Sequence, residues 1–557
     1  MLKFSKSLCG WFGVADALLL ASLLAPARLV AQAKPTAGTA TTTFRVAGTV
    51  VNSNTAQPLA RVQISLTNTK DPKDTRDMTT AADGHFQFQV KPGKYSLQGS
   101  KHGFVTFAYE QHENFWTAIV PGAGVDTENL IFRLPPAATI TGRVVDDVGD
   151  PVRGAAVTVF REDHSTGASH IQRAFNAVTD DQGTYELTPL AAGTYYVGAQ
   201  AQPWYAVHPL TSQAVAAQYQ VDRNLDVAFP MSFYKEATEA DDATPIPIRA
   251  GDRAQVDLPM TPVPALHLLI HARPDSPRGM VQPNLQKPLF DGNSEPVNAL
   301  AELVSPGSYE MTGIAAGKYL VQSRNTENGI VKDAGEVFLN ADGQVLDSSG
   351  GAATGSVRIA AQVRGLTKLP DQLLLALRNT QGRVLPGVEV NDHGEADFAA
   401  IAPGKYDIVA GSPAKIYSIL RITSEGKTLS GHTITITSGA SLKVSAALVG
   451  GAVTVEGFAK KQGKPAPVAM IVLVPSDPEV NLDLFRRDQS DLDGSFALQQ
   501  VIPGTYTILA IEDGWDLDWA KPAVIESYRQ HGQKIVIGDT AKGFVRLSSA
   551  VEVQPRL

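Results

Sequence analysis

Three short clusters of aromatic residues carry the side chains best suited to bind a ligand in this 557-residue sequence. They comprise Phe115, Trp116, Trp204, Tyr205, Trp515, Asp516, Asp518 and Trp519. Rings that loops expose can stack on sugar rings, and neighbouring carboxylates can accept hydrogen bonds from sugar hydroxyls. The pattern is compatible with a carbohydrate platform. The other interpretation, in which the rings close the ends of folded domains as large aromatic side chains usually do, is favoured over it, because a platform would also need an exposed apolar patch.

The sequence lacks the common motifs that hold a catalytic metal or nucleophile. No histidine is followed by glutamate three residues later, and His112-Glu113 has no second histidine four residues after the first. Both zinc-peptidase patterns therefore fail. There is also no Gly-x-Ser-x-Gly elbow and no glycine-rich loop followed by Lys and Ser or Thr. We predict a protein that is not an enzyme, has no catalytic residue and needs no cofactor.

The run Asp488-Gln489-Ser490-Asp491-Leu492-Asp493-Gly494 resembles the start of a calcium-binding loop. Its first ligand position is Gln489 and its twelfth is Gln500, so the set of oxygen ligands is incomplete. Asp and Gly also supply the geometry that tight turns need. We therefore predict a hairpin turn at this place and no metal site.

The aromatic clusters follow copies of a unit that occurs five times and would position them. Each copy has an Asp-Gly turn or a less complete form of it, then a strand of nearly constant length, and then a second glycine turn that leads to a tyrosine. Each tyrosine is expected to begin a strand, bury its ring and bond its hydroxyl near the rim of the sheet. The structural residues of the unit are Gly84, Gly93, Tyr95, Gly183, Gly193, Tyr195, Gly317, Tyr319, Gly404, Tyr406, Gly494, Gly504 and Tyr506.

The predicted fold class is all-β, a tandem array of about five antiparallel β-sandwich modules of transthyretin-like or immunoglobulin-like type. A chain of this length is too long for one core, and short alternating strands between turn signals are typical of sandwiches. The one helix expected is short, from Pro522 to Gln530. The second strand of module 3 is hard to place in the proline-rich run from Pro274 to Pro296. The expected boundaries are 44–135 for module 1, 137–262 for module 2 with an insertion, 264–352 for a degenerate module 3, 356–448 for module 4 and 450–557 for module 5.

Residues 1–33 have the pattern of a signal peptide. Lys3 and Lys6 precede an apolar stretch from Val14 to Ala25, and Ala31-Gln32-Ala33 is a small-x-small cleavage site. Cys9 is the single cysteine and precedes the apolar stretch, which argues against a lipid-anchored lipoprotein. A flexible leader follows at 34–43. We expect an exported protein, in the periplasm, on the cell surface or secreted, with no membrane span in the mature chain.

Module 2 carries the clearest resemblance to a known family. Gly142 to Asp146, Gly149 to Val157, Asp181 to Tyr185 and Ala192 to Tyr195 together resemble the carboxypeptidase regulatory-like domain. Modules 1 and 5 match well, module 4 in part, and module 3 only around its glycine and tyrosine turns. The resemblance implies a transthyretin-like sandwich, akin to carbohydrate-binding-like folds, in a secreted or surface-displayed bacterial protein of tandem non-catalytic modules.

The resulting hypothesis is a non-catalytic, secreted or cell-envelope protein for binding or adhesion, with glycan as the expected ligand class. Two alternatives stay open: a structural spacer that binds nothing, and an accessory subunit of an envelope complex or transporter. The expected partners are accordingly glycans or cell-envelope proteins. The net charge of −8 argues against nucleic acid and anionic membrane surfaces as partners.

Overall fold

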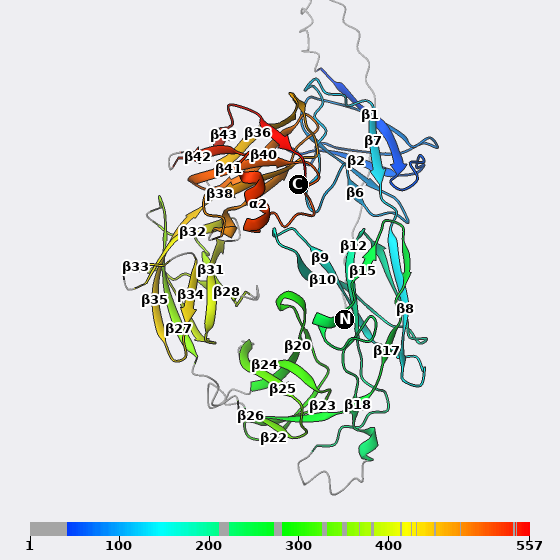
Figure 1. The fold of residues 1–557 in the computed structure, drawn as a ribbon, viewed down its shortest axis with the longest axis vertical. Coiled ribbons are helices and arrows are strands. Elements are labelled where there is room, and N and C mark those ends of the chain that lie inside the picture. The colour runs from blue at the N-terminus through cyan, green and yellow to red at the C-terminus, as the bar shows by residue number, and fades with distance from the viewer. Residues whose placement is uncertain are drawn as a thin grey trace, which may run out of the picture. The chain divides into compact units, whose positions relative to one another are not determined.

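Strands make up most of the regular structure of the protein, as Figure 1 shows. The computed structural model describes residues 42–210, 222–271, 281–325, 331–347, 354–366, 368–379, 384–412, 415–424, 426–429, 432–450, 453–479, 481–538, 541 and 543–557. The predicted all-β fold is confirmed, and the short helix expected near 522–530 is α2 (Pro522–Arg529). The predicted signal peptide at 1–33 lies outside the described residues.

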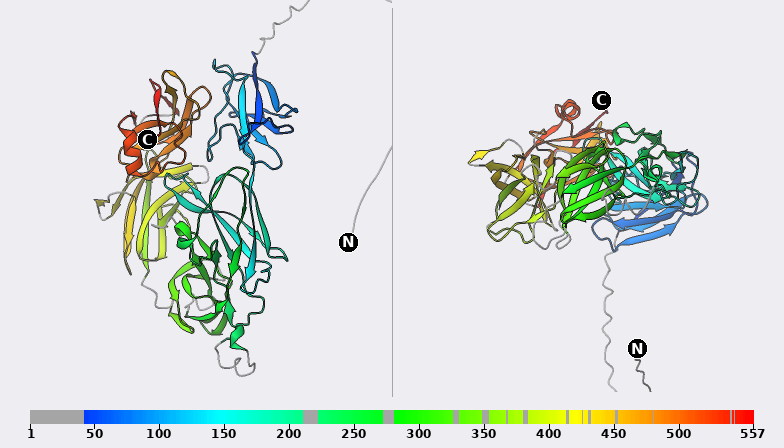
Figure 2. Two further views of the ribbon diagram at one scale, coloured as in Figure 1. Left: turned by 45° about the vertical axis from the view of Figure 1, so that its right-hand side comes forward. Right: turned by 90° about the horizontal axis from the view of Figure 1, so that it is seen from below.

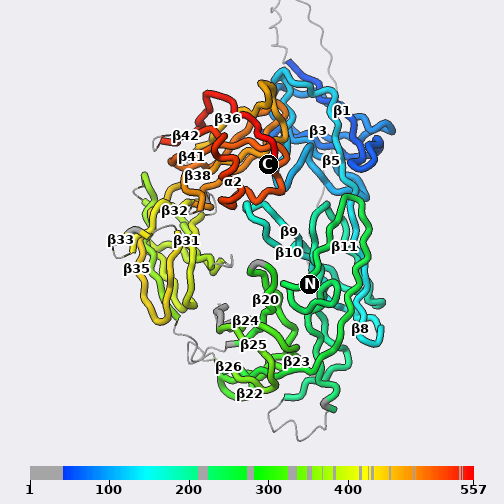
Figure 3. The backbone as a smooth tube through the Cα atoms, viewed as in Figure 1, coloured from blue at the N-terminus to red at the C-terminus, as the bar shows by residue number. Residues whose placement is uncertain are grey.

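Modules 1 and 2 each fold into two main sheets. Module 1 has sheets β4-β1-β7 and β3-β2-β5-β6, and module 2 has sheets β11-β8-β16 and β10-β9-β12-β14. Figure 3 traces the neighbouring strands β9 and β10 of module 2. The strands are β1 (Phe44–Asn52), β2 (Gln63–Asn68), β3 (Thr75–Thr79), β4 (His85–Val90), β5 (Tyr95–Ser100), β6 (Phe107–Ala108), β7 (Leu130–Leu134), β8 (Ala138–Asp146), β9 (Ala156–Asp163), β10 (His170–Val178), β11 (Thr184–Leu190), β12 (Gly193–Gln200), β13 (Val227–Ala228), β14 (Ser232–Phe233), β15 (Ile246–Ile248), β16 (Arg253–Gln255), β17 (Leu258–Met260) and β18 (Val263–Pro264). 

Modules 3, 4 and 5 repeat the arrangement with variations. Module 3 has sheets β22-β23-β19-β26 and β21-β20-β24-β25, and in modules 4 and 5 the strands of each module join in one nine-stranded sheet. β20 supplies the second strand of module 3 that the sequence left unplaced. The strands are β19 (Leu266–His271), β20 (Val281–Pro288), β21 (Ser294–Pro296), β22 (Leu300–Ser305), β23 (Ser308–Ile314), β24 (Gly317–Asn325), β25 (Val331–Leu339), β26 (Gln344–Asp347), β27 (Gly355–Val363), β28 (Leu374–Asn379), β29 (Val388–Glu389), β30 (Glu395–Ile401), β31 (Gly404–Ser412), β32 (Lys415–Ser424), β33 (Lys427–Thr428), β34 (Thr433–Ile436), β35 (Ser441–Gly450), β36 (Val453–Lys461), β37 (Lys464–Pro465), β38 (Met470–Pro475), β39 (Arg486–Gln489), β40 (Ser495–Val501), β41 (Gly504–Ile511), β42 (Gln533–Ile537), β43 (Gly543–Arg546) and β44 (Val551–Gln554). Short 3-10 helices lie at η1 (Arg223–Leu225), η2 (Ala240–Asp242), η3 (Phe290–Gly292) and η5 (Leu482–Leu484).

The first strand of every module pairs in parallel with a late strand of the same module. The parallel pairs are β1 with β7, β8 with β16 and β17, β19 with β26, β27 with β35, and β36 with β43 and β44. The other pairs of the named strands are antiparallel, except that β41 also pairs in parallel with β44. Figure 2 shows the strands from two further directions. Each of the five predicted modules supplies most of the residues of one hydrophobic cluster, and the module boundaries stay a prediction.

The repeated tyrosines behave as the sequence predicts. Each lies within the first three residues of its strand and has a buried ring. Each hydroxyl donates a hydrogen bond to the backbone carbonyl oxygen four residues earlier, which ties the turn to the strand, as in the tyrosine corner of immunoglobulin-like sandwiches. The five bonds are Tyr95 to Lys91 at 3.1 Å, Tyr195 to Ala191 at 2.8 Å, Tyr319 to Ala315 at 2.7 Å, Tyr406 to Ala402 at 3.0 Å and Tyr506 to Ile502 at 3.0 Å.

The glycine of the first turn has a left-handed backbone in all five modules, including Gly307 of module 3. Gly494 has φ of +78°, and a Cβ atom there would lie 2.4 Å from the carbonyl oxygen of Ala459. The predicted φ > 0 at Gly494 is therefore confirmed. Gly84, Gly183 and Gly394 share this conformation. Because other residues strain to adopt it, the repeated glycines set the turn.

Candidate ligand-binding site

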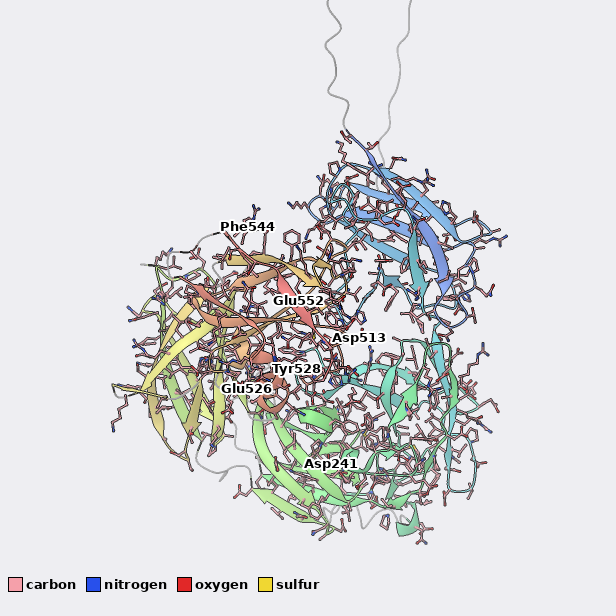
Figure 4. All side chains as sticks on the ribbon, turned by 45° about the horizontal axis from the view of Figure 1, so that its top comes forward. Asp241, Asp513, Glu526, Tyr528, Phe544 and Glu552 are labelled. Atoms are coloured by element: carbon pink, nitrogen blue, oxygen red, sulfur yellow. The ribbon has the colours of Figure 1, made fainter. Side chains whose placement is uncertain are left out.

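Trp515 and Trp519 are buried, with exposed fractions of 9% and 6%. They belong to a hydrophobic cluster of module 5 that includes Ile525 and Tyr528 of α2, the latter labelled in Figure 4. The expectation that an indole face of this loop is open to solvent is therefore wrong. The physical reason is that groups distant in sequence cover the rings.

Residues of module 1 cover Trp515. The ring of His112 stacks on the indole, with ring centres 5.0 Å apart and planes 11° apart, and Phe115 lies with its ring centre at 5.7 Å. The indole N–H donates to the carbonyl oxygen of Val468 at 3.3 Å. Phe115, one of the predicted ligand residues, is thus part of a contact between modules.

Arg487 lies at the centre of this contact. Its guanidinium pairs with both carboxylate oxygens of Glu113, one of them at 3.2 Å, and donates to the carbonyl oxygen of Ser165 at 3.1 Å. The guanidinium also lies over the ring of Trp519, 4.5 Å from its centre. A single buried side chain of module 5 therefore bonds to modules 1 and 2. Arginine is suited to this because its planar guanidinium group carries five N–H donors.

The carboxylates beside the two tryptophans bond to protein groups. Asp518 accepts from the backbone N–H of Ser169 at 2.7 Å and pairs with Lys521 at 2.6 Å and with His164 at 3.2 Å. The bond from Lys521, followed by those from Ser169 and His164, holds the pKa of Asp518 below its ordinary value. Asp516 pairs with Arg556 at 2.8 Å. Both carboxylates therefore join their loop to other parts of the chain.

The aspartate turn of module 5 also contacts module 1. Asp491 accepts from Lys94 at 2.5 Å and from the backbone N–H of Ala118 at 2.9 Å, and the N–H of Leu492 donates to the carbonyl oxygen of Ala118 at 3.0 Å. Burial raises the pKa of Asp488 to about 6. Among the described residues no group of three His, Cys, Asp or Glu side chains could hold a metal.

Trp204 and the half-buried Tyr205 form an aromatic pair. Trp204 is 88% exposed, and its ring meets that of Tyr205 edge to face, with centres 5.7 Å apart. Partial burial, and then the charges of Asp147 and Asp146, raise the pKa of the Tyr205 hydroxyl. Trp204 is thus an open indole beside a phenol, and Asp146 and Asp147 lie near enough to that phenol for their charges to act on its pKa. Trp116 is exposed to a lesser degree, at 42%.

The sequence did not predict that Arg487, Gln489 and Ser490 join module 5 to other modules. The amide of Gln489 donates to the Glu110 carbonyl oxygen at 2.5 Å and to the Thr117 hydroxyl at 2.8 Å. Both partners are more than 350 residues away in the chain, so no local pattern points to them. The sole local signal is that polar residues replace the alternating apolar ones around the turn.

Comparison with known proteins identifies a domain family. The profile of the carboxypeptidase regulatory-like domain matches residues 45–121 and 139–229. No curated protein matches the chain. No helix of the described part of the chain is long and apolar enough to cross a membrane.

Solved structures of similar fold superpose poorly on the whole chain. The TIE protein of Bacillus anthracis shares 12% identity, over 73% of this chain and 74% of that one, with a TM-score of 0.17. The shaft pilin SpaA of Lactobacillus rhamnosus GG shares 14% over 40% and 98%, with a TM-score of 0.18. GBS52, the minor pilin of Streptococcus agalactiae, shares 13% over 40% and 97%, with a TM-score of 0.21.

Proposed function

The chain contains carboxypeptidase regulatory-like domains in tandem, and from this premise we propose that it is an exported, non-catalytic protein of the cell envelope that binds carbohydrate through Trp204 and Tyr205 of module 2. The observation that carries the proposal is the 88% exposure of the Trp204 indole. At this exposure the flat apolar face of the indole is accessible to a ligand.

The chemistry of the site suits a sugar ring. Trp204 offers a flat apolar face, and the edge of Tyr205 stands against it at an interplanar angle of 88°. Asp147 is exposed beside them and can accept hydrogen bonds from hydroxyls. Stacking on one indole contributes on the order of 1–3 kcal/mol, by analogy with base stacking, so a single site binds weakly.

Retention of the chain on insoluble polysaccharides tests the proposal. We expect residues 34–557 to be retained on at least one of cellulose, chitin and peptidoglycan, and Trp204→Ala to abolish retention without changing the melting temperature. Phe544→Ala is the matched control, since Phe544 is 66% exposed in module 5 and lies at the outside of the molecule in Figure 4. If the chain is never retained, the spacer hypothesis is preferred. If both variants are retained as well as the parent, the Trp204 site is refuted.

A further inference from the structure

Three modules close one end of their sandwich with a returning piece of their own chain. In modules 1, 2 and 5 the chain folds back against the first strand at a proline. The residue after that proline donates its backbone N–H to a carbonyl oxygen of the first strand. The pairs are Leu59 to Val50 at 2.9 Å, Val152 to Val144 at 3.0 Å and Ala466 to Ala459 at 3.1 Å. We name this piece the return segment.

A side-chain hydroxyl from a later part of the same module also forms hydrogen bonds with each return segment. The side chains of Thr80, Thr179 and Ser490 donate to the carbonyl oxygens of Leu59, Val152 and Ala466 at 2.7, 2.6 and 2.7 Å. The same hydroxyls accept from the backbone N–H groups of Val62, Ala155 and Ala469 at 3.0, 2.8 and 2.9 Å. The return segment is thus fixed by the same bonds in three modules.

Module 4 has the same backbone arrangement, but it has different residues at the position of the N–H donor and at the position of the hydroxyl. Ala361 donates to the Gly394 carbonyl oxygen at 2.7 Å, as Val50 does to Gly84. Gln372 has φ of +57°, which matches Arg61, Gly154 and Val468 of the other modules. This register places Pro370 where Leu59, Val152 and Ala466 stand, and Val390 where the hydroxyls stand. Proline has no N–H and valine has no hydroxyl, so neither bond can form.

An open groove of about 1190 Å³ lies at this end of module 4, lined by both of these residues. Ala361 to Val363 of β27 line it on one side and Lys368 to Gln372 on the other, so the return segment forms a wall of the groove. In module 1 the backbone nitrogen of Leu59 lies 3.0 Å from the Cβ position of Gly84, whereas near Gly394 there is a side-chain carbon of Leu369 at 3.4 Å.

We propose that this groove binds an extended segment of a partner polypeptide, with a small aliphatic residue whose backbone N–H bonds the Ala361 carbonyl oxygen. The segment would take the place that the other modules fill with their own chain. An extended peptide is suited to it because it presents a main-chain donor and a small apolar side chain together, as in strand addition. The described lining residues include no Trp, Tyr or Phe ring, which argues against a stacked sugar.

The charges at the rim fit a polypeptide that carries both signs. Arg364, Lys368 and Arg421 line the groove together with Asp371, Glu389 and Asp392. Lys368 pairs with Asp371 at 3.6 Å. A strongly anionic or cationic ligand would meet like charges on part of this rim. The site is independent of the Trp204 platform, which lies in module 2.

Binding of a peptide that copies a return segment tests the proposal. The probe is a fluorescein-labelled peptide of residues 462–468, Gln-Gly-Lys-Pro-Ala-Pro-Val, titrated with residues 34–557 and followed by anisotropy. We expect saturable binding. A peptide N-methylated at its alanine lacks the N–H, and we expect it to bind at least about tenfold more weakly. Equal affinity of the two peptides, or no saturation at millimolar concentration, would overturn the proposal.

A gain-of-structure variant provides a second test. Pro370→Ala with Val390→Thr restores the missing N–H and hydroxyl, so module 4 should hold its own return segment and close the groove. We expect peptide affinity to fall by at least about tenfold while the melting temperature is kept or raised. Thr179→Val in module 2 is the control, which should leave peptide binding unchanged. Unchanged binding by the double variant, or dimerisation of the parent chain through this groove in sedimentation, would contradict the partner proposal. If the double variant does not fold, the N-methylated peptide still decides.

Discussion

Replacing Arg487 should weaken the contact among modules 1, 2 and 5 far more than loss of a surface ion pair would. The Arg487 side chain is 4% exposed, and Glu113 is 16% exposed. Removing one partner of a buried pair leaves the other charge without compensation and costs about 3–5 kcal/mol. Arg487→Met keeps most of the apolar stem, so the change acts on the guanidinium bonds to Glu113 and Ser165.

Calorimetry of residues 34–557 measures this effect. One kcal/mol shifts the melting temperature of a domain of this size by about 4–8 °C, so the transition that involves module 5 should fall by at least about 12 °C. Arg546→Met is the matched control, because Arg546 pairs with Glu456 at 3.0 Å but is 81% exposed. Such pairs contribute about 0–1 kcal/mol. Equal shifts for the two variants would refute the view that Arg487 holds the modules together.

Three further predictions concern module 5. Gly494→Ala should lower the free energy of unfolding by more than about 1 kcal/mol in denaturant titrations, because its Cβ would meet a carbonyl oxygen at 2.4 Å. Gly463→Ala should do less, since Gly463 has the same φ of +78° and open space around it; equal effects would exclude the clash. The folded state holds the pKa of Asp488 at about 6, above the ordinary 3.8, so between these values it binds more protons than the unfolded state. Stability should therefore fall as pH rises through this window, and Asp488→Asn should flatten the melting temperature measured across it; a parallel pH profile for the variant would contradict this. Tyr506→Phe should cost about 0.5–1.5 kcal/mol in thermal unfolding, because the bond to the Ile502 carbonyl oxygen is lost; no change would show that this bond is not needed.

The repeated unit could be predicted because its residues act locally. A glycine at φ > 0 fixes a turn by its own backbone, and a tyrosine two residues after a second glycine reaches a carbonyl only four residues away. These choices depend on short stretches of chain. The tyrosine strands and the conformation of Gly494 therefore follow from the sequence.

The candidate site could be predicted only in part. Trp204 and Trp515 look alike in sequence, since each follows a repeat tyrosine, yet one is open and the other is covered by His112. The residue that covers Trp515 is some 400 positions away in the chain. Burial of this kind is decided by contacts between modules, which no local pattern records.

The sequence by itself determined the strand-rich class, the turns and the tyrosines, because the allowed backbone angles of glycine and the alternation of side chains act within a few residues. Only the tertiary structure decided the parallel pairing of first and last strands, because a strand's own pattern does not state the direction of its neighbour. The tertiary structure also decided the structural effect of Pro370 and Val390. Each is an ordinary residue in the sequence, and each lines an open groove at the place where the other modules have a donor and a hydroxyl.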